Sequence, residues 1–293
     1  MMSFAVACAV LAALCSAVGA QLQHSGVRAE TQDRGLRLRT LAKLVRNRDW
    51  IRGFAVLFAC AVLQILALTF APVSLVAPIV VLALPMVALL NAHSGAVPID
   101  RAGWIAVGAT SLAVGVFVTV SAGAVAEVRI PPGAVLTSGI VIGAAVLLLG
   151  IAALVSRGNA RCVALAMAAG AAYGLVSVLL RDVTYSTRIE GLSGLPPLSA
   201  LGVVVAFLAG SWLIQLGYDS GPADVVVGSQ TVVNPLVATV IGMTLLDETT
   251  SLDGGASAVL VACGVVAMAG VLVLARHHPD ASAREQQRAP ALG

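Results

Sequence analysis

The stretch PVSLVAPIVVLALP, Pro72–Pro85, is apolar except for Ser74, and yet it contains three prolines. Proline has no backbone N–H, and inside a helix it frees the carbonyl four residues earlier from its hydrogen bond. Because lipid offers no partner to a freed carbonyl, such a helix must face protein or a water-filled cavity. The stretch therefore predicts a membrane-spanning helix, kinked at Pro78 and Pro85, that lines a central path.

The composition of the whole chain indicates the same setting. Its 293 residues are 59% hydrophobic and 11% charged, and the mean hydropathy is +0.99. A soluble domain holds about 45–50% apolar residues, whereas one crossing of a membrane needs about 20 consecutive apolar residues. We therefore expect an all-α polytopic membrane protein with about nine transmembrane helices, at residues 3–22, 53–71, 73–93, 103–123, 134–155, 162–180, 197–217, 224–246 and 255–275.

The basic residues indicate how the chain is oriented. Positive charge in short loops collects on the cytoplasmic side of a membrane. Eight Lys or Arg residues lie between the first two spans and six more lie in loops and the tail on the same side, whereas three, Arg129, Arg181 and Arg188, lie opposite. This split predicts an N-terminus outside and a C-terminus inside, in the cell membrane (inner or plasma).

The first cytoplasmic loop is itself amphipathic. Within the basic segment Arg28–Arg52, a helix places Leu38, Leu41 and Val45 on one face, with Arg and Lys residues around them. Such a helix lies in the headgroup region of an anionic leaflet, so the lipid bilayer is the expected partner, and an acidic protein partner is the alternative. The tail, 276–293, is expected to be a disordered cytoplasmic segment. No nucleic-acid partner is expected, and a homodimer is left open.

The proline stretch has a counterpart in the second half of the chain. PADVVVGSQTVVNP, Pro222–Pro235, keeps the 13-residue spacing of the outer prolines, and a glutamine, Gln64 or Gln215, precedes each copy. We infer a repeat, in which residues 1–155 hold spans 1–4 and a linking fifth span, and residues 156–275 hold spans 6–9. Spans 1 and 6 then cross in opposite directions. This inverted topology is typical of secondary transporters, whose substrates bind near the midplane.

The second copy carries polar groups beside its kink. Gln230 and Asn234 lie one turn apart on one helix face, directly before Pro235. Polar side chains within spans normally face the bundle interior, where they either bind a solute or hydrogen-bond to neighbouring helices. The substrate-binding residues are expected among these polar residues of the spans: Gln64, Asn91, Tyr173, Gln215, Gln230, Thr231 and Asn234.

Two glycine pairs predict close contacts between helices. They are Gly139 and Gly143 in GIVIG, and Gly170 and Gly174 in GAAYG. A helix face that lacks side chains lets a neighbouring backbone approach closely.

The sequence carries no pattern of an enzyme. It shows no nucleophile–base set, no metal-ligand cluster and no phosphate-binding loop. The five cysteines fall inside expected spans, where small core residues are the simplest interpretation. We therefore expect a non-enzymatic protein that uses no cofactor and holds no resident metal.

Two motifs carry a family resemblance. FAPVSLVAP, Phe70–Pro78, resembles the corresponding stretch of the NIPA-like magnesium-transporter branch of the drug/metabolite transporter (DMT) superfamily. PLVATVIGMTLLDE, Pro235–Glu248, resembles the proline-to-glutamate pattern of its EamA-like members. The resemblance implies a bundle of around ten helices with alternating access to a central pocket. The chain departs from it at Pro98, where the first half would have the matching glutamate, and in its nine expected spans.

The resemblance implies Mg²⁺ as the substrate, but the residues favour another class. Mg²⁺ prefers octahedral oxygen ligands, usually with carboxylates, and the acids of this chain, such as Asp224 and Glu248, sit at span edges. Amides and hydroxyls suit a small neutral or zwitterionic metabolite, moved by a secondary transporter through a central pocket. Proton coupling through a buried acid is not expected. The alternatives left open are a Mg²⁺ transporter, a flippase for a lipid-linked substrate and a non-transporting membrane scaffold.

Overall fold

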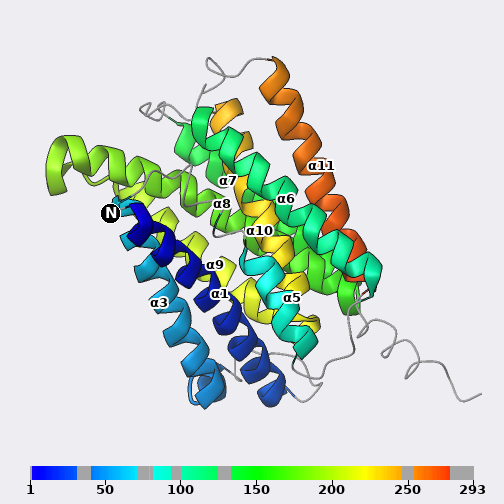
Figure 1. The fold of residues 1–293 in the computed structure, drawn as a ribbon. Coiled ribbons are helices and arrows are strands. Elements are labelled where there is room, and N and C mark those ends of the chain that lie inside the picture. The colour runs from blue at the N-terminus through cyan, green and yellow to red at the C-terminus, as the bar shows by residue number, and fades with distance from the viewer. Residues whose placement is uncertain are drawn as a thin grey trace, which may run out of the picture.

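The computed structural model describes residues 2–31, 41–70, 79, 82–93, 100–124, 133–245 and 254–277 of the chain. Within these ranges all regular secondary structure is helical, and no strand is present. Eight of the helices are long and apolar enough to cross a membrane. The described part of the chain is therefore all-helical, with the architecture of a multi-pass membrane protein (Figure 1).

Eight of the nine expected spans are confirmed as long apolar helices. The described helices are α1 (Met2–Thr31), α2 (Leu41–Leu44), α3 (Arg48–Phe70), α5 (Ala83–His93), α6 (Arg101–Ala124), α7 (Ala134–Val155), α8 (Gly158–Glu190), the 3-10 helix η2 (Gly191–Gly194), α9 (Pro197–Ser220), α10 (Ala223–Leu245) and α11 (Gly254–His277). The third expected span, 73–93, is described mainly over α5, because residues 71–78, 80 and 81 lie outside the described part of the chain.

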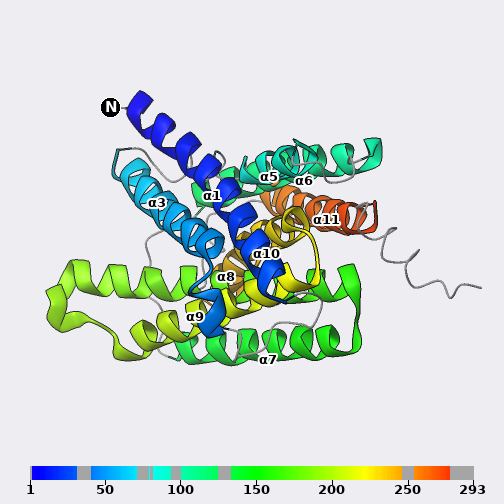
Figure 2. The same ribbon diagram turned by 90° about the horizontal axis from the view of Figure 1, so that it is seen from below.

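Two helices run further than hydropathy predicts. α1 continues past its expected end to Thr31, because Gln23 is buried against neighbouring helices and does not stop it. α8 has 33 residues, about 50 Å at 1.5 Å per residue, which exceeds the ~30 Å hydrocarbon core. Its polar last turns project from the bundle with the start of α9 in both ribbon views (Figures 1 and 2). Asp182 of α8 accepts a hydrogen bond from the Ser199 hydroxyl of α9 and so ties this hairpin.

A side-chain cap fixes where α3 begins. The Asn47 side chain accepts hydrogen bonds from the backbone N–H groups of Asp49 (3.0 Å) and Trp50 (3.1 Å), as N-cap asparagines do. The same side chain donates to Glu30 of α1 at 3.1 Å, so the end of α1 lies beside the start of α3. We call this end of the bundle the basic end, because the segment Arg28–Arg52 connects the two helices here.

The amphipathic face expected in the basic segment is described only in part. Val45 is 55% exposed, as suits a residue facing headgroups, whereas Leu44 beside it is fully buried in the core. Leu38, the Leu41 side chain and the tail 278–293 lie outside the described residues. Anchoring of this segment to lipid therefore stays a prediction.

Helices of the first and second halves of the chain form similar packed pairs. α1 lies along α3 and α8 lies along α9 (Figure 2), while α6 lies along α11 and α5 contacts α10. Glycine permits the first pairing, since a methyl group on Gly53 of α3 would lie 2.8 Å from the backbone nitrogen of Gln23. α7 packs mainly on α8. A methyl group on its Gly139 or Gly143 would have no neighbour within 4 Å, so the described helices do not pack closely at GIVIG.

Buried side chains form one large core at the basic end. It joins α1, α2, α5, α6, α8, α9, α10 and α11 through residues such as Val27, Leu44, Val107, Val226 and Leu274. A small separate cluster of α7 and α8 lies at the same end. Away from the basic end the buried residues form three clusters, one between α1 and α3, one among α6, α10 and α11, and one among α7, α8, α9 and α10. The described helices are thus joined most continuously at the basic end.

Candidate functional site

Two pairs of polar side chains from three helices lie one turn apart along α8. The Tyr173 hydroxyl of α8 and the Ser211 hydroxyl of α9 are hydrogen-bonded at 3.1 Å. The Ser177 hydroxyl, one turn along α8, lies 3.1 Å from the Tyr173 carbonyl oxygen and 3.4 Å from Oδ1 of Asn234 in α10, and these two acceptors share its single proton. We call Tyr173, Ser177, Ser211 and Asn234 the hydroxyl–amide group. The structure thus brings together two of the expected site residues, Tyr173 and Asn234, and adds the two serines.

α8 approaches α10 closely because two glycines face that helix. A methyl group on Gly174 would lie 2.8 Å from Cβ of Val237 and 3.0 Å from the carbonyl oxygen of Asn234. One on Gly170 would lie 3.1 Å from the carbonyl oxygen of Gln230. Any side chain at these positions would push the helices apart, so the close packing predicted for GAAYG is confirmed.

The hydroxyl–amide group is reachable from outside the core. Ser177 is exposed, and the other three members are half-buried. Gln230 and Thr231, on α10 one turn before Asn234, are also half-buried. Pro235 lies inside α10 as expected, and it leaves the Thr231 carbonyl without its helical partner. An additional acceptor therefore lies one turn from the Asn234 side chain.

The remaining residues expected in the first half are placed differently. Pro85 is the third residue of α5, so within the described residues it starts this helix and does not bend it. In a first turn the missing N–H has no helical partner to lose, and proline is favoured there. Gln64 is half-buried on α3, which contributes no residue to the hydroxyl–amide group. Pro78 and the Asn91 side chain lie outside the described residues.

Gln215 belongs to a second polar cluster, buried at the basic end. Its amide nitrogen donates to Oε1 of Gln23 in α1 at 2.9 Å, and its Oε1 accepts from the indole N–H of Trp50 in α3 at 3.0 Å. Gln23 and Gln215 are 4% and 7% exposed. We call Gln23, Trp50 and Gln215 the amide–indole cluster. The sequence held a signal for Gln23, because Gly19, Gln23 and Gly26 recur at helical spacing and indicate one continuing face.

Titratable residues also lie at the basic end. The His24 ring meets the buried Tyr218 ring edge to face at 5.9 Å. Asp224, expected at a span edge, lies in the first turn of α10 and is 0% exposed, a position where the helix dipole favours a carboxylate. In the part of the chain that the structure describes, no three His, Cys, Asp or Glu residues gather as metal ligands.

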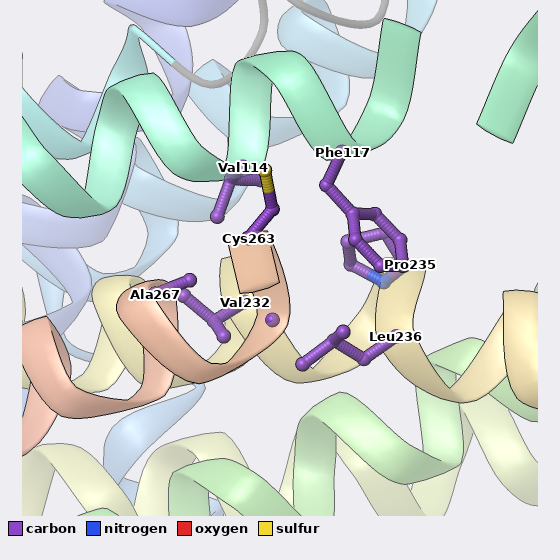
Figure 3. A pocket seen from close by; sticks show the side chains of 8 residues that line it. Val114, Phe117, Val232, Pro235, Leu236, Cys263 and Ala267 are labelled. Carbon is purple, nitrogen blue, oxygen red and sulfur yellow. The ribbon is translucent and has the colours of Figure 1, made fainter. Parts of the chain in front are cut away.

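A shallow hollow of about 150 Å³ lies between α6, α10 and α11 beside Pro235 (Figure 3). Its lining is apolar: Val114, Phe117, Val232, Pro235, Leu236, Cys263, Gly264 and Ala267. The hollow is too narrow for a water molecule and so does not suit a polar solute. Where α5 meets α10, a methyl group on Gly228 would lie 3.1 Å from Leu84. α5 and α10, which were expected to line a polar path, therefore make an apolar contact at Leu84 and Gly228.

No protein-family model matches the chain, and neither curated proteins nor solved structures give a match. The resemblance to the DMT superfamily therefore stays a prediction. The function has to be inferred from the two polar clusters and from the packing of the helices around them.

Proposed function

We propose that this chain is a secondary transporter that moves a small neutral or zwitterionic solute by alternating access, with the hydroxyl–amide group as the substrate contact. The observation that carries this proposal is the gathering of three hydroxyls and one amide beside a proline inside α10, with Ser177 exposed. Lipid satisfies no polar group at this depth, so exposed ones favour contact with water or a polar ligand.

Distances along the helices support a position inside the membrane. At 1.5 Å per residue, α10 rises about 17 Å from Ala223 to Asn234, and α8 rises about 22 Å from Gly158 to Tyr173. Both helices start at the basic end, and the hydrocarbon core is about 30 Å thick. By the same rise, Ser211 lies about 14 Å from the end of α9 and Ser177 about 28 Å from the start of α8. The hydroxyl–amide group therefore spans the central part of the membrane.

The packing of the helices supports an inverted repeat. α1 with α3 and α8 with α9 are corresponding pairs of the two proposed halves, and α5 with α10 and α6 with α11 pair each helix with its own counterpart. A two-fold axis between the halves produces contacts of this kind. The excess of Lys and Arg in the basic segment supports an outside N-terminus and an inside C-terminus.

The motifs around Phe70–Pro78 and Pro235–Glu248, together with this repeat, favour the DMT superfamily, in its EamA-like or NIPA-like branch. Within that family a neutral or zwitterionic solute is the better match. Mg²⁺ binding normally uses carboxylates and retained water, and the hydroxyl–amide group consists of hydroxyls and one carboxamide.

Uptake into proteoliposomes tests the proposal. The purified full chain is reconstituted, and uptake of radiolabelled neutral amino acids, polyols and sugars is compared with uptake of Mg²⁺. We expect at least one uncharged or zwitterionic solute to be moved, and Asn234→Ala to lower its uptake at least about tenfold. Ser229→Ala is the matched control on α10, because the Ser229 hydroxyl donates to its own helix at Val225, and this variant keeps its uptake. Uptake by Asn234→Ala at the wild-type rate, or no solute moved, would contradict the proposal.

A further inference from the structure

The amide–indole cluster joins parts of the chain that alternating access has to separate. Gln23 in α1 and Trp50 in α3 belong to the first proposed half, whereas Gln215 in α9 belongs to the second and is 192 residues from Gln23. In inverted-repeat transporters one half rocks against the other around a central site. A contact between the α1–α3 pair and α9 at the basic end must therefore break when this end opens.

Gln23 and Trp50 form one rigid surface for Gln215. A methyl group on Gly26 would lie 2.8 Å from Cβ of Trp50, and one on Gly53 would lie 2.9 Å from Cγ of Gln23. α1 and α3 are thus in backbone contact on both sides of the cluster. Gln215 is the only residue of α9 in the cluster. Its amide nitrogen bonds Gln23 of α1, and its amide oxygen bonds Trp50 of α3.

The surroundings make this contact sensitive to small movements. The cluster sits in the large apolar core of the basic end, close to Val27, Ile214 and Tyr218. A carboxamide in such a place is stable while both of its polar atoms are paired, and costly once one partner has moved away. The hydrogen bonds therefore form together and break together, which is the behaviour of a latch.

The rest of the bundle indicates which conformation the latch belongs to. At the basic end, one core joins eight of the described helices, whereas away from this end no cluster of described buried residues joins more than four. Ser177 of the hydroxyl–amide group is exposed and lies beyond the middle of α8, away from the basic end. The structure thus combines a tightly packed basic end with an exposed Ser177 hydroxyl away from that end.

We propose that Gln23, Trp50 and Gln215 form the gate at the basic end. The gate is hydrogen-bonded while the hydroxyl–amide group faces the opposite side, and the α1–α3 pair separates from α9 when the solute passes to the basic side. This inference rests on the proposed transport function. The experiments therefore measure from which side the reporter can be labelled, in addition to solute uptake.

The first experiment locks the gate. In the full chain with its five cysteines replaced by alanine, Gln23→Cys and Gln215→Cys are introduced together with a reporter, Ser177→Cys, that is labelled by a membrane-impermeant maleimide. Copper phenanthroline is added to join residues 23 and 215 before labelling. We expect the oxidised protein to lose labelling of the reporter from the basic side and to keep labelling from the opposite side. Reduction of the disulfide should restore labelling from the basic side. Unchanged labelling from the basic side after complete cross-linking would overturn the gate.

The matched control places the same cross-link inside one half. A Cβ on Gly19 of α1 would lie 2.7 Å from Cγ of Leu57 in α3, so Gly19→Cys with Leu57→Cys joins two helices that stay together in the proposed motion. We expect this cross-link to leave reporter labelling on both sides unchanged. A loss of basic-side labelling here as well would show that cross-linking itself immobilises the protein, and the gate would not be supported.

The second experiment weakens the gate without a cross-link. Gln215→Met keeps the length of the side chain but cannot bond Gln23 or Trp50, and we expect labelling of the reporter from the basic side to rise roughly tenfold. Gln21→Met, on another face of α1, is the control and keeps the original labelling. An unchanged labelling ratio for Gln215→Met, in protein that still elutes as a folded monodisperse species, would contradict the gate.

The two proposals fail in distinguishable ways. If no solute is moved, but the 23–215 cross-link still blocks labelling from the basic side, the gate stands and the proposed transport of small polar solutes falls. If a solute is moved, and the cross-linked protein moves it as fast as the reduced protein, transport stands and the gate falls.

Discussion

The Ser177 hydroxyl of α8 lies 3.4 Å from Oδ1 of Asn234 in α10 and donates a hydrogen bond to it. The bond crosses the interface between the two helices about one turn from Gly174, whose missing side chain lets α8 approach the Asn234 backbone. Polar contact and close packing therefore depend on each other at this point. A change that separates the two helices also removes the hydroxyl–amide group.

Gly174→Val is expected to destabilise the protein by this route. The new side chain would collide with Val237 and with the Asn234 carbonyl, and overpacking of this kind costs about 1–3 kcal/mol. Thermal unfolding of the detergent-solubilised protein, followed by size-exclusion chromatography, should show a lower Tm. Gly143→Val on α7 is the control, since the described residues leave open space around Gly143. Equal Tm values for both variants would contradict the close packing of α8 on α10.

The positions of the membrane-spanning helices were predictable from the sequence. Which helices pack against each other was not. Eight helices follow from runs of apolar residues, because the length of such a run decides whether it can cross a membrane. The boundaries failed where a polar residue is accommodated, as at Gln23, which is buried, and at Asp182, which accepts a hydrogen bond from Ser199 of α9. The bond between Gln23 and Gln215 depends on how α1, α3 and α9 pack together, and hydropathy carries no information about that packing. Gln215 was accordingly expected in the same site as Asn234, and it lies in the other cluster.

Asn234→Asp tests the class of substrate. A carboxylate beside the Ser177 and Tyr173 hydroxyls supplies the anionic oxygen that Mg²⁺ prefers, and a ligand that binds the folded state raises the Tm. We expect millimolar Mg²⁺ to stabilise Asn234→Asp and to leave the wild-type Tm unchanged, with choline chloride at equal ionic strength as the control. Stabilisation of the wild-type protein by Mg²⁺ would instead favour the magnesium-transporter alternative.

The orientation is testable at two exposed residues on opposite ends of the bundle. Val45, in the basic segment, is 55% exposed, and Leu195, between α8 and α9, is 45% exposed. In a chain without its native cysteines, Leu195→Cys should react with an impermeant maleimide on intact cells. Val45→Cys should react only after permeabilisation, because positive loops stay on the cytoplasmic side. The reverse labelling pattern would indicate the opposite orientation. Labelling of both cysteines on intact cells would contradict the number of spans between residues 45 and 195.

Pro235→Ala separates a role of the kink in transport from a role in folding. The alanine N–H can bond the Thr231 carbonyl, so α10 gains a hydrogen bond and becomes straighter. The same change removes a free acceptor one turn from Asn234 and shifts the part of α10 that follows. We therefore expect a Tm that is unchanged or higher, together with uptake reduced about tenfold, measured in proteoliposomes at matched protein content. Pro197→Ala is the control, because Pro197 is the first residue of α9, where proline interrupts no helical bond. Wild-type uptake by Pro235→Ala would show that neither the bend nor the freed carbonyl contributes to transport, and the solute contact would then have to be sought away from α10.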